Sequence, residues 1–136
     1  MTISPERRRD YARKALAGIR LVNGGLGLLA PAVLARQVAA DPKTNPAALY
    51  AFRMFGVRTI LIAVDLLMPD GPVRAHAVRV APVIHATDTF SVALAGVRGE
   101  LPPRVAVKLG VISGVNTALA IIAQPARSTP SGELRA

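Results

Sequence analysis

AALYAFRMFGVRTILIAVDLLM, residues 47–68, is long enough to cross a bilayer as one helix, yet it carries Arg53, Arg58 and Asp65. On insertion scales each Leu, Ile, Phe or Val returns roughly 0.3 to 0.6 kcal/mol, whereas a charge at the helix centre costs about 2.5 to 3.5 kcal/mol. The apolar residues therefore do not offset the three charges. As a membrane span, this segment needs charge partners on neighbouring helices or a wet cavity.

The three charges do not share one helix face. Arg58 and Asp65 are seven residues apart, which places them on the same face about two turns from each other. Arg53 projects away from that face. The partners that these side chains need must come from other segments.

Three further apolar segments have a similar length, at residues 15–35, 74–97 and 104–123. Pro31 is expected to kink or tighten the last turn of the first segment. Short polar breaks separate the segments: a stretch with two prolines at 36–46, PDGP at 69–72 and RGELPP at 98–103. The pattern predicts an all-α protein, an antiparallel four-helix transmembrane bundle over residues 15–123. A basic segment, 1–14, precedes it, and residues 124–136 are expected to form a disordered tail.

Basic residues suggest an orientation. They are dense before the first apolar segment, flank the second break and follow the last segment. The positive-inside rule then places both termini in the cytoplasm, in a multi-pass protein of the cell (inner) membrane. A soluble bundle is the competing interpretation, but it needs a wide polar face on each helix. The stretches LGLLAPAVLA and LGVISGVNTALAIIA show no such face.

Composition excludes several functions. The chain has 136 residues, which fits one domain, and 51% of them are apolar. Without cysteine it has no disulfide, thiol nucleophile or thiolate metal site. The net charge of +9 does not indicate nucleic acid binding, because the basic residues are scattered and no nucleic-acid motif accompanies them. No phosphate-binding or serine-hydrolase motif is present, and we expect no cofactor.

With both termini inside, the polar residues of the segments can be assigned depths. Arg20, Asp65 and Arg79 fall in the inner third, with Asn23 just above them. The middle holds Arg58, His85, Asp88 and Asn116, and the outer third holds Arg53 and Lys108. This predicts pairing of Asp65 with Arg20 or Arg79, and of Asp88 with Arg58, Arg53 or Lys108. The segments contain more cations than carboxylates. Either the pairs only hold the helices in register, or the core admits water or an anionic or electron-rich ligand.

His85 and Asp88 lie at i and i+3, so that imidazole and carboxylate share one helix face and can act as an acid–base unit. A metal site is not expected from so few ligands. The candidate catalytic residues are Asp65, His85 and Asp88, and the candidate substrate-binding residues are Asn23, Arg53, Arg58 and Asn116. Gly110 and Gly114 form a GxxxG pattern, which predicts a contact face for a homo-oligomer.

Arg53-Met-Phe-Gly-Val-Arg58, followed by an apolar run, and His85-Ala-Thr-Asp88 in the next segment together carry a resemblance. The chain resembles the small four-helix integral membrane proteins of high-GC bacteria, which are loosely similar to DoxX-like proteins. The resemblance covers residues 20–123. It implies the four-span fold and a polar core at Arg53, Arg58, His85 and Asp88, and it implies no established reaction.

Three functional classes remain open. The first is a membrane-embedded enzyme that uses acid–base chemistry for isomerisation, cyclisation or epoxide opening of a lipophilic small molecule. The second is a carrier or conduit for a proton or a small anion. The third is an accessory subunit whose buried charges are structural. We favour the first, with membrane lipid and a lipophilic small molecule as the expected partners, because the middle layer with His85 and Asp88 forms a compact site.

Overall fold

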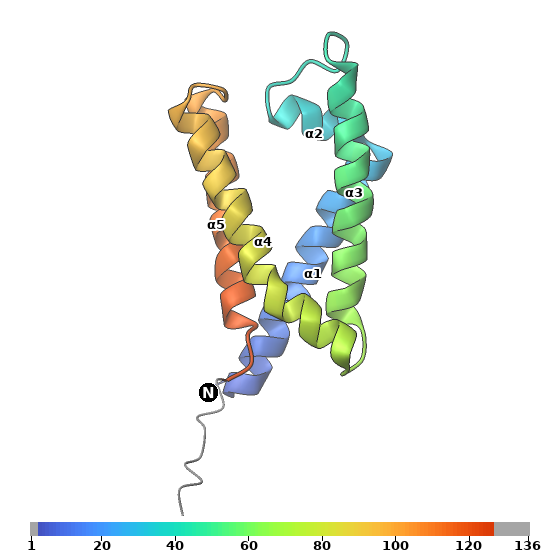
Figure 1. Cartoon of the computed structure of the whole chain (residues 1–136), viewed down its shortest axis with the longest axis vertical. Coiled ribbons are helices and arrows are strands. Elements are labelled where there is room, and N and C mark those ends of the chain that lie inside the picture. Colours follow the sequence, from blue (N-terminus) through green and yellow to red (C-terminus); the bar gives the residue numbers. More distant parts are fainter. Residues whose placement is uncertain (1–2, 127–136) are drawn as a thin grey trace, which may run out of the picture.

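The computed structural model describes residues 3–126, which form five α-helices and no strands (Figure 1). The helices are α1 (Pro5–Leu29), α2 (Pro31–Gln37), α3 (Pro46–Leu67), α4 (Pro72–Val97) and α5 (Pro103–Ile122). Each helix begins at a proline, whose fixed φ suits the first turn and whose missing N–H would be unpaired there in any case. The all-α class predicted from the sequence is confirmed.

Three of the predicted segments agree with α3, α4 and α5 to within two residues. The first segment differs. Its helix begins at Pro5, so that most of the basic segment 1–14 is helical, and it ends at Leu29. The chain then bends by 107° into α2. The bend follows from Pro31, which has no N–H for a helical bond and disfavours a helical conformation at Ala30, where φ is −135° and ψ is 55°. The predicted tail begins at Gln124 and from residue 127 lies outside the described residues.

α3, α4 and α5 are each long and apolar enough to cross a membrane, and the bent pair of α1 and α2 gives a fourth candidate span. Many large apolar side chains lie on the outer surface, among them Leu61, Phe90, Val111, Val115 and Ile121. Apolar surface on this scale is unfavourable in water and favourable against lipid. These are the properties of a membrane protein.

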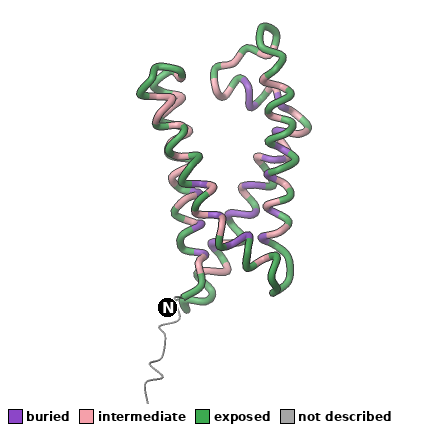
Figure 2. Tube along the Cα trace, viewed as in Figure 1, coloured by how far each residue is buried: buried purple, intermediate pink, exposed green. Residues whose placement is uncertain are grey.

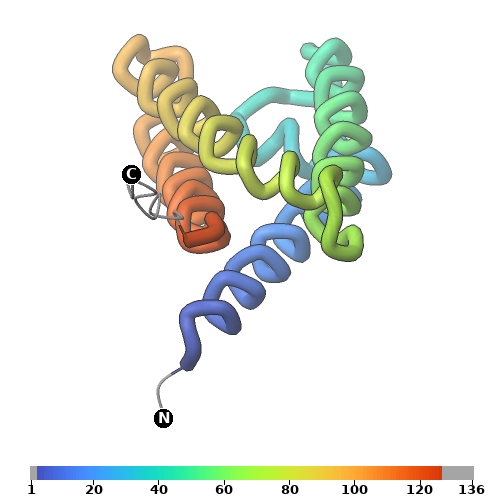
Figure 3. The backbone as a smooth tube through the Cα atoms, turned by 60° about the horizontal axis from the view of Figure 1, so that its bottom comes forward, coloured from blue at the N-terminus to red at the C-terminus, as the bar shows by residue number. Residues whose placement is uncertain are grey.

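The long helices pack as two pairs, α1 with α3 and α4 with α5, which meet at the end that carries the N-terminus (Figures 1 and 3). From this closed end the pairs diverge toward an open end, where α2 and the α2–α3 and α4–α5 connections lie. The buried core gathers toward the closed end (Figure 2). It consists of Leu16, Ala17, Leu66, Ala77, Val78, Ala81 and Ala120.

Glycine lets the backbones of α1 and α3 touch. A Cβ placed on Gly56 would lie 2.5 Å from the main-chain nitrogen of Leu28, and one on Gly27 would lie 2.7 Å from the carbonyl oxygen of Phe52. Neither distance is tolerated by a real side chain, so this approach requires glycine.

A proline inside α4 is compensated from a distant part of the chain. Pro82 has no N–H to donate to the carbonyl oxygen of Val78, four residues earlier. The side-chain amide of Gln124, just beyond α5, donates to that oxygen instead. α4 therefore continues through Pro82 without leaving a main-chain acceptor unpaired.

Candidate functional site

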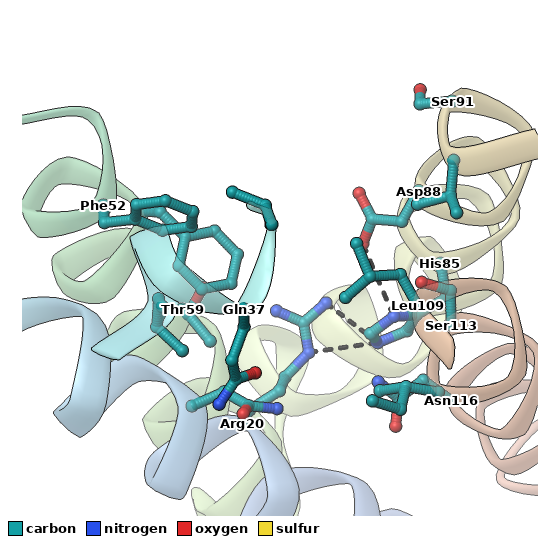
Figure 4. A pocket seen from close by; sticks show the side chains of 16 residues that line it. Arg20, Gln37, Phe52, Thr59, His85, Asp88, Ser91, Leu109, Ser113 and Asn116 are labelled. Atoms are coloured by element: carbon teal, nitrogen blue, oxygen red, sulfur yellow. Dashed lines mark hydrogen bonds and ion pairs between the residues drawn. The ribbon is translucent and has the colours of Figure 1, made fainter. Parts of the chain in front are cut away.

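A cavity of about 340 Å³ lies between the two helix pairs, with walls from α1 to α5 (Figure 4). Its lining is part polar and part apolar. The polar residues are Arg20, Asn23, Gln37, Thr59, His85, Asp88, Ser91, Ser113 and Asn116, and the apolar residues are Leu34, Val38, Phe52, Phe55, Val92, Leu109 and Ile112.

Arg20 on α1 and His85 on α4 meet across the cavity. Both are buried, with exposed fractions of 5% and 3%. The Nε and Nη2 atoms of Arg20 lie 3.1 Å and 2.9 Å from Nε2 of His85 (Figure 4). Because guanidinium N–H groups only donate, Nε2 must be an acceptor without a hydrogen. In a neutral imidazole the proton then sits on Nδ1.

Asp88 lies on the other side of the imidazole. Its Oδ2 is 3.7 Å from Nδ1 of His85, one turn earlier on α4, and its side chain is 54% exposed. The carboxylate is thus placed to attract the Nδ1 proton, which supports the tautomer that Arg20 requires. Arg20, His85 and Asp88 form a row in which the imidazole faces a partner at each nitrogen, and the carboxylate is the accessible end of the row.

Asn116 on α5 adds an unpaired acceptor to the lining. It is 9% exposed, and its Oδ1 has no hydrogen-bond partner among residues 3–126. A buried polar atom left without a partner costs about 1 to 3 kcal/mol. Oδ1 itself is covered by neighbouring atoms, so a ligand that donates an N–H or O–H group can reach it once the amide turns toward the cavity.

The cavity ends on the core at the closed end of the molecule. Arg20 is one turn from Leu16 on α1, and His85 is one turn from Ala81 on α4. Asn116 is one turn from Ala120 on α5. Each polar residue is therefore next to an apolar core residue of its own helix.

The opposite wall is formed by α2 and α3. Phe52 and Phe55 pack edge to face with ring centroids 6.4 Å apart, and Thr59 follows one turn later (Figure 4). The bend at Pro31 brings Leu34 and Gln37 of α2 to the same wall. A molecule in the cavity thus meets aromatic rings on one side and the charged row on the other.

The structure brings together four of the residues that the sequence suggested: Asn23, His85, Asp88 and Asn116 line one cavity. Arg53 and Arg58 are exposed on α3 and do not line it. Asp65 is half-buried and also lies outside the lining.

The predicted charge pairs are not formed within residues 3–126. The ion pairs there include neither Asp65 with a cation nor Asp88 with Arg53, Arg58 or Lys108. The reason is that these three cations lie on exposed positions of their helices. Around the cavity one guanidinium faces one carboxylate, so the excess of cations expected for the core does not apply to this site.

Several lining residues were missed by the sequence. The sequence pairs Asp65 with Arg20 or Arg79 and does not indicate a contact of Arg20 with His85. It gives no signal for Gln37, Phe52, Phe55 and Thr59. A usable signal existed for two others: Ser91 lies three residues after Asp88, and Ser113 three residues before Asn116. That spacing places each serine on the face of a residue already suspected.

Within the described part of the chain, no group of three or more His, Cys, Asp and Glu side chains is placed to hold a metal ion. No family model, curated protein or solved structure matches the chain. The resemblance to DoxX-like membrane proteins stays a prediction.

Proposed function

We propose that this protein is a multi-pass protein of the cell membrane whose cavity binds a lipophilic small molecule by its polar end and transfers a proton on it. One observation carries the proposal: the row of Arg20, His85 and Asp88 borders a cavity whose opposite wall carries aromatic and aliphatic side chains. Buried ionisable groups within a membrane-spanning region are costly, and in such proteins they commonly mark functional sites.

The row suggests separate roles for its members. Both imidazole nitrogens face partners, so His85 is a positioning residue, and Asp88 is the accessible proton acceptor. The Nη1 group of Arg20 is not used by His85 and suits negative charge that develops on a substrate oxygen. The amide of Asn116, turned toward the cavity, accepts a hydrogen bond from a hydroxyl or amine of the ligand. This division fits isomerisation, cyclisation or epoxide opening of a neutral substrate.

The closed floor of the cavity favours an enzyme over a conduit. A proton or anion path across the membrane needs polar groups at successive depths. Below Arg20 and His85 the interior is filled by Leu16, Ala17 and Leu66. This arrangement supports a compact site reached from one side.

A structural role for the charged row is the second candidate. The burial of Arg20 and His85, and their direct hydrogen bonds across two helix pairs, favour it. The half-exposed Asp88 separates the two candidates, because a purely structural carboxylate gains little from facing a cavity.

We further propose a four-span arrangement with both termini in the cytoplasm. The alternating direction of α1, α3, α4 and α5 in Figure 1 supports it, since the basic residues of α1 and of the α3–α4 turn then lie at the same end. The chain has no cysteine, so single cysteines can report sidedness. In intact cells an impermeant thiol reagent should label Glu100→Cys and leave Glu6→Cys unlabelled. The reverse pattern would invert the topology.

The homo-oligomer through Gly110 and Gly114 stays a proposal. A Cβ on Gly114 would meet nothing within 4 Å, so the face has room for a second copy. A Gly114→Leu variant should lower the oligomeric mass in detergent if this face is used.

The test of the cavity is native mass spectrometry of protein purified from membranes under mild conditions. Wild type should carry a specific small-molecule adduct, and Asp88→Asn should lose or change it while remaining folded. Arg53→Gln is the matched control, since it removes an exposed charge outside the lining. Once the adduct is identified, Asp88→Asn should slow its turnover by about 10² to 10⁴-fold. An adduct that binds unchanged when Asp88 or Asn116 is replaced would refute the site.

A further inference from the structure

A second pocket, of about 330 Å³, lies at the closed end of the molecule, away from the cavity described above. It is formed by the first turns of α1, the start of α4 and the end of α5. Four arginines surround it, namely Arg9, Arg13, Arg74 and Arg79, together with Asp10, Asp70 and Gln124.

The guanidinium group of Arg13 already has partners within the protein. Its Nη1 donates to the carbonyl oxygen of Leu66 near the end of α3, and its Nη2 pairs with Asp10. Lys14 also pairs with Asp10 at 2.7 Å. Hydrogen bonds from Lys14 and Arg13 hold the pKa of Asp10 below its usual range, so this carboxylate is ionised at neutral pH and already has its counter-charges.

Arg74 has partners of the same kind: it donates to the carbonyl oxygen of Met68 and forms an ion pair with Asp70. Both carboxylates of the pocket are thus used by arginines that secure the end of α3. Arg9 and Arg79 have no ion-pair partner among residues 3–126. The pocket therefore retains two guanidinium groups with no counter-charge there.

The surface beside this pocket combines more positive charge with apolar side chains. A contiguous hollow, which shares Arg9 with the pocket, is lined by Arg8, Ile121 and Ile122. Both isoleucines are exposed, at 58% and 42%. The arginines belong to the first turns of α1 and α4, beside the apolar parts of these helices, where the proposed spans would meet a membrane–water interface.

We propose that this pocket holds the phosphate of an anionic membrane lipid, with Arg9 and Arg79 binding the phosphate and the acyl chain lying against Ile121 and Ile122. Guanidinium groups bind phosphate oxygens through paired, charge-assisted hydrogen bonds. A basic pocket between helices at the interface is a common form of lipid headgroup site. The proposal goes beyond the proposed function: it rests on the membrane placement of the helices but not on the role proposed for the cavity.

Native mass spectrometry of the full chain in detergent tests the lipid site. Phosphatidylglycerol and phosphatidylcholine with identical acyl chains are added at equal concentration. Wild type should retain phosphatidylglycerol preferentially, and the Arg9→Gln/Arg79→Gln variant should bind it roughly thirtyfold more weakly. The matched control is Arg104→Gln/Lys108→Gln, which removes the same charge at the start of α5 and should bind like wild type.

Two outcomes would overturn the proposal. One is an equal loss in the Arg104→Gln/Lys108→Gln control, which would indicate general charge attraction. The other is complete displacement of the lipid by inorganic phosphate at the same concentration, which would indicate a free-phosphate site. Arg9 and Arg79 make no ion pair in the described chain, so the double variant should unfold at the wild-type temperature; if it does not fold, Arg9→Gln alone is measured.

Discussion

Oδ1 of Asn116 is buried without a hydrogen-bond partner in the described chain, at a position one turn from the core. The adjacent residue on α5 has its hydroxyl paired: Thr117 donates to the carbonyl oxygen of Ser113, and its hydroxyl lies 3.1 Å from that of Thr89 on α4. The unpaired oxygen of Asn116 therefore lowers the stability of the empty protein, as polar groups kept for ligand binding often do.

Replacing Asn116 with leucine should therefore stabilise the empty protein. We expect a gain of about 1 to 2 kcal/mol, because leucine has a similar size and no unpaired oxygen. The same variant should lose the small-molecule adduct. Thermal unfolding in detergent measures the first effect and native mass spectrometry the second. Asn23→Leu, at a half-buried lining position, is the control and should give no gain; a destabilised Asn116→Leu would contradict the account.

The tautomer of His85 offers a second test at this scale. Arg20 donates to Nε2, so the proton should reside on Nδ1. ¹⁵N NMR of histidine-labelled protein can distinguish the two nitrogens, and the exposed His76 provides an internal reference. Arg20→Gln should reduce the fraction of the Nδ1–H form. An Nε2–H signal from His85 in wild type would exclude the row as described.

Single residues were only partly predictable. The spacing of His85 and Asp88 on one helix indicates their proximity, because that contact is local. The contact of Arg20 with His85 joins residues 65 positions apart. If the helices were straight and parallel, Arg20 would lie in the inner third of the membrane and His85 in the middle. The two helix pairs are inclined to each other, and the two side chains meet.

At the scale of elements, the close approach of α1 and α3 depends on Gly24, Gly27 and Gly56. Gly18 and Gly25 lie on the same helix but take no part in this contact, because a Cβ at either position would meet nothing within 4 Å. Composition alone does not tell which side of a helix faces its neighbour.

Gly56→Ala should destabilise the protein by about 1 to 3 kcal/mol, since the new methyl group collides with the backbone of α1. Gly18→Ala is the matched change in open space on α1, and it should be neutral or stabilise by up to about 1 kcal/mol through helix propensity. Chemical unfolding in detergent compares the two. Equal effects would show that backbone contact between α1 and α3 is not required.

The ends of the helices were the most predictable feature of the elements. Proline at the first turn and the PDGP turn are local signals, and they place α3, α4 and α5 to within two residues. The size of the bend at Pro31 was not predictable, because a proline removes a bond but does not fix an angle. The angle comes from packing: Leu34 and Ala35 of α2 are buried.

At the scale of the whole molecule, the two helix pairs share a core at the closed end and separate toward the open end. The sequence could not predict this shape, because α5 and the apolar part of α1 are apolar nearly all round and no polar stripe marks their outer side. Arg53 and Arg58 were expected in the core because a charge that faces lipid is costly, but both are exposed.

A molecule bound in the cavity should draw the helix pairs together. Spin labels on Lys43→Cys and Glu100→Cys report the open end, and labels on Glu6→Cys and Asp70→Cys report the closed end. Pulsed electron paramagnetic resonance should show a shorter, narrower distance at the open end on ligand binding and no change at the closed end. An unchanged open end would mean that the cavity is preformed.

The hydrogen bond from Gln124 to Val78 has a consequence for biosynthesis. Pro82 leaves the oxygen of Val78 without its helical donor, and the replacement comes from a residue that follows α5. In a nascent chain that contains only α1 to α4, the carbonyl oxygen of Val78 therefore has no such donor, and Pro82 lies about one turn from His85. The ribosome must add α5 and Gln124 before the wall of the site is finished, so the site does not mature helix by helix.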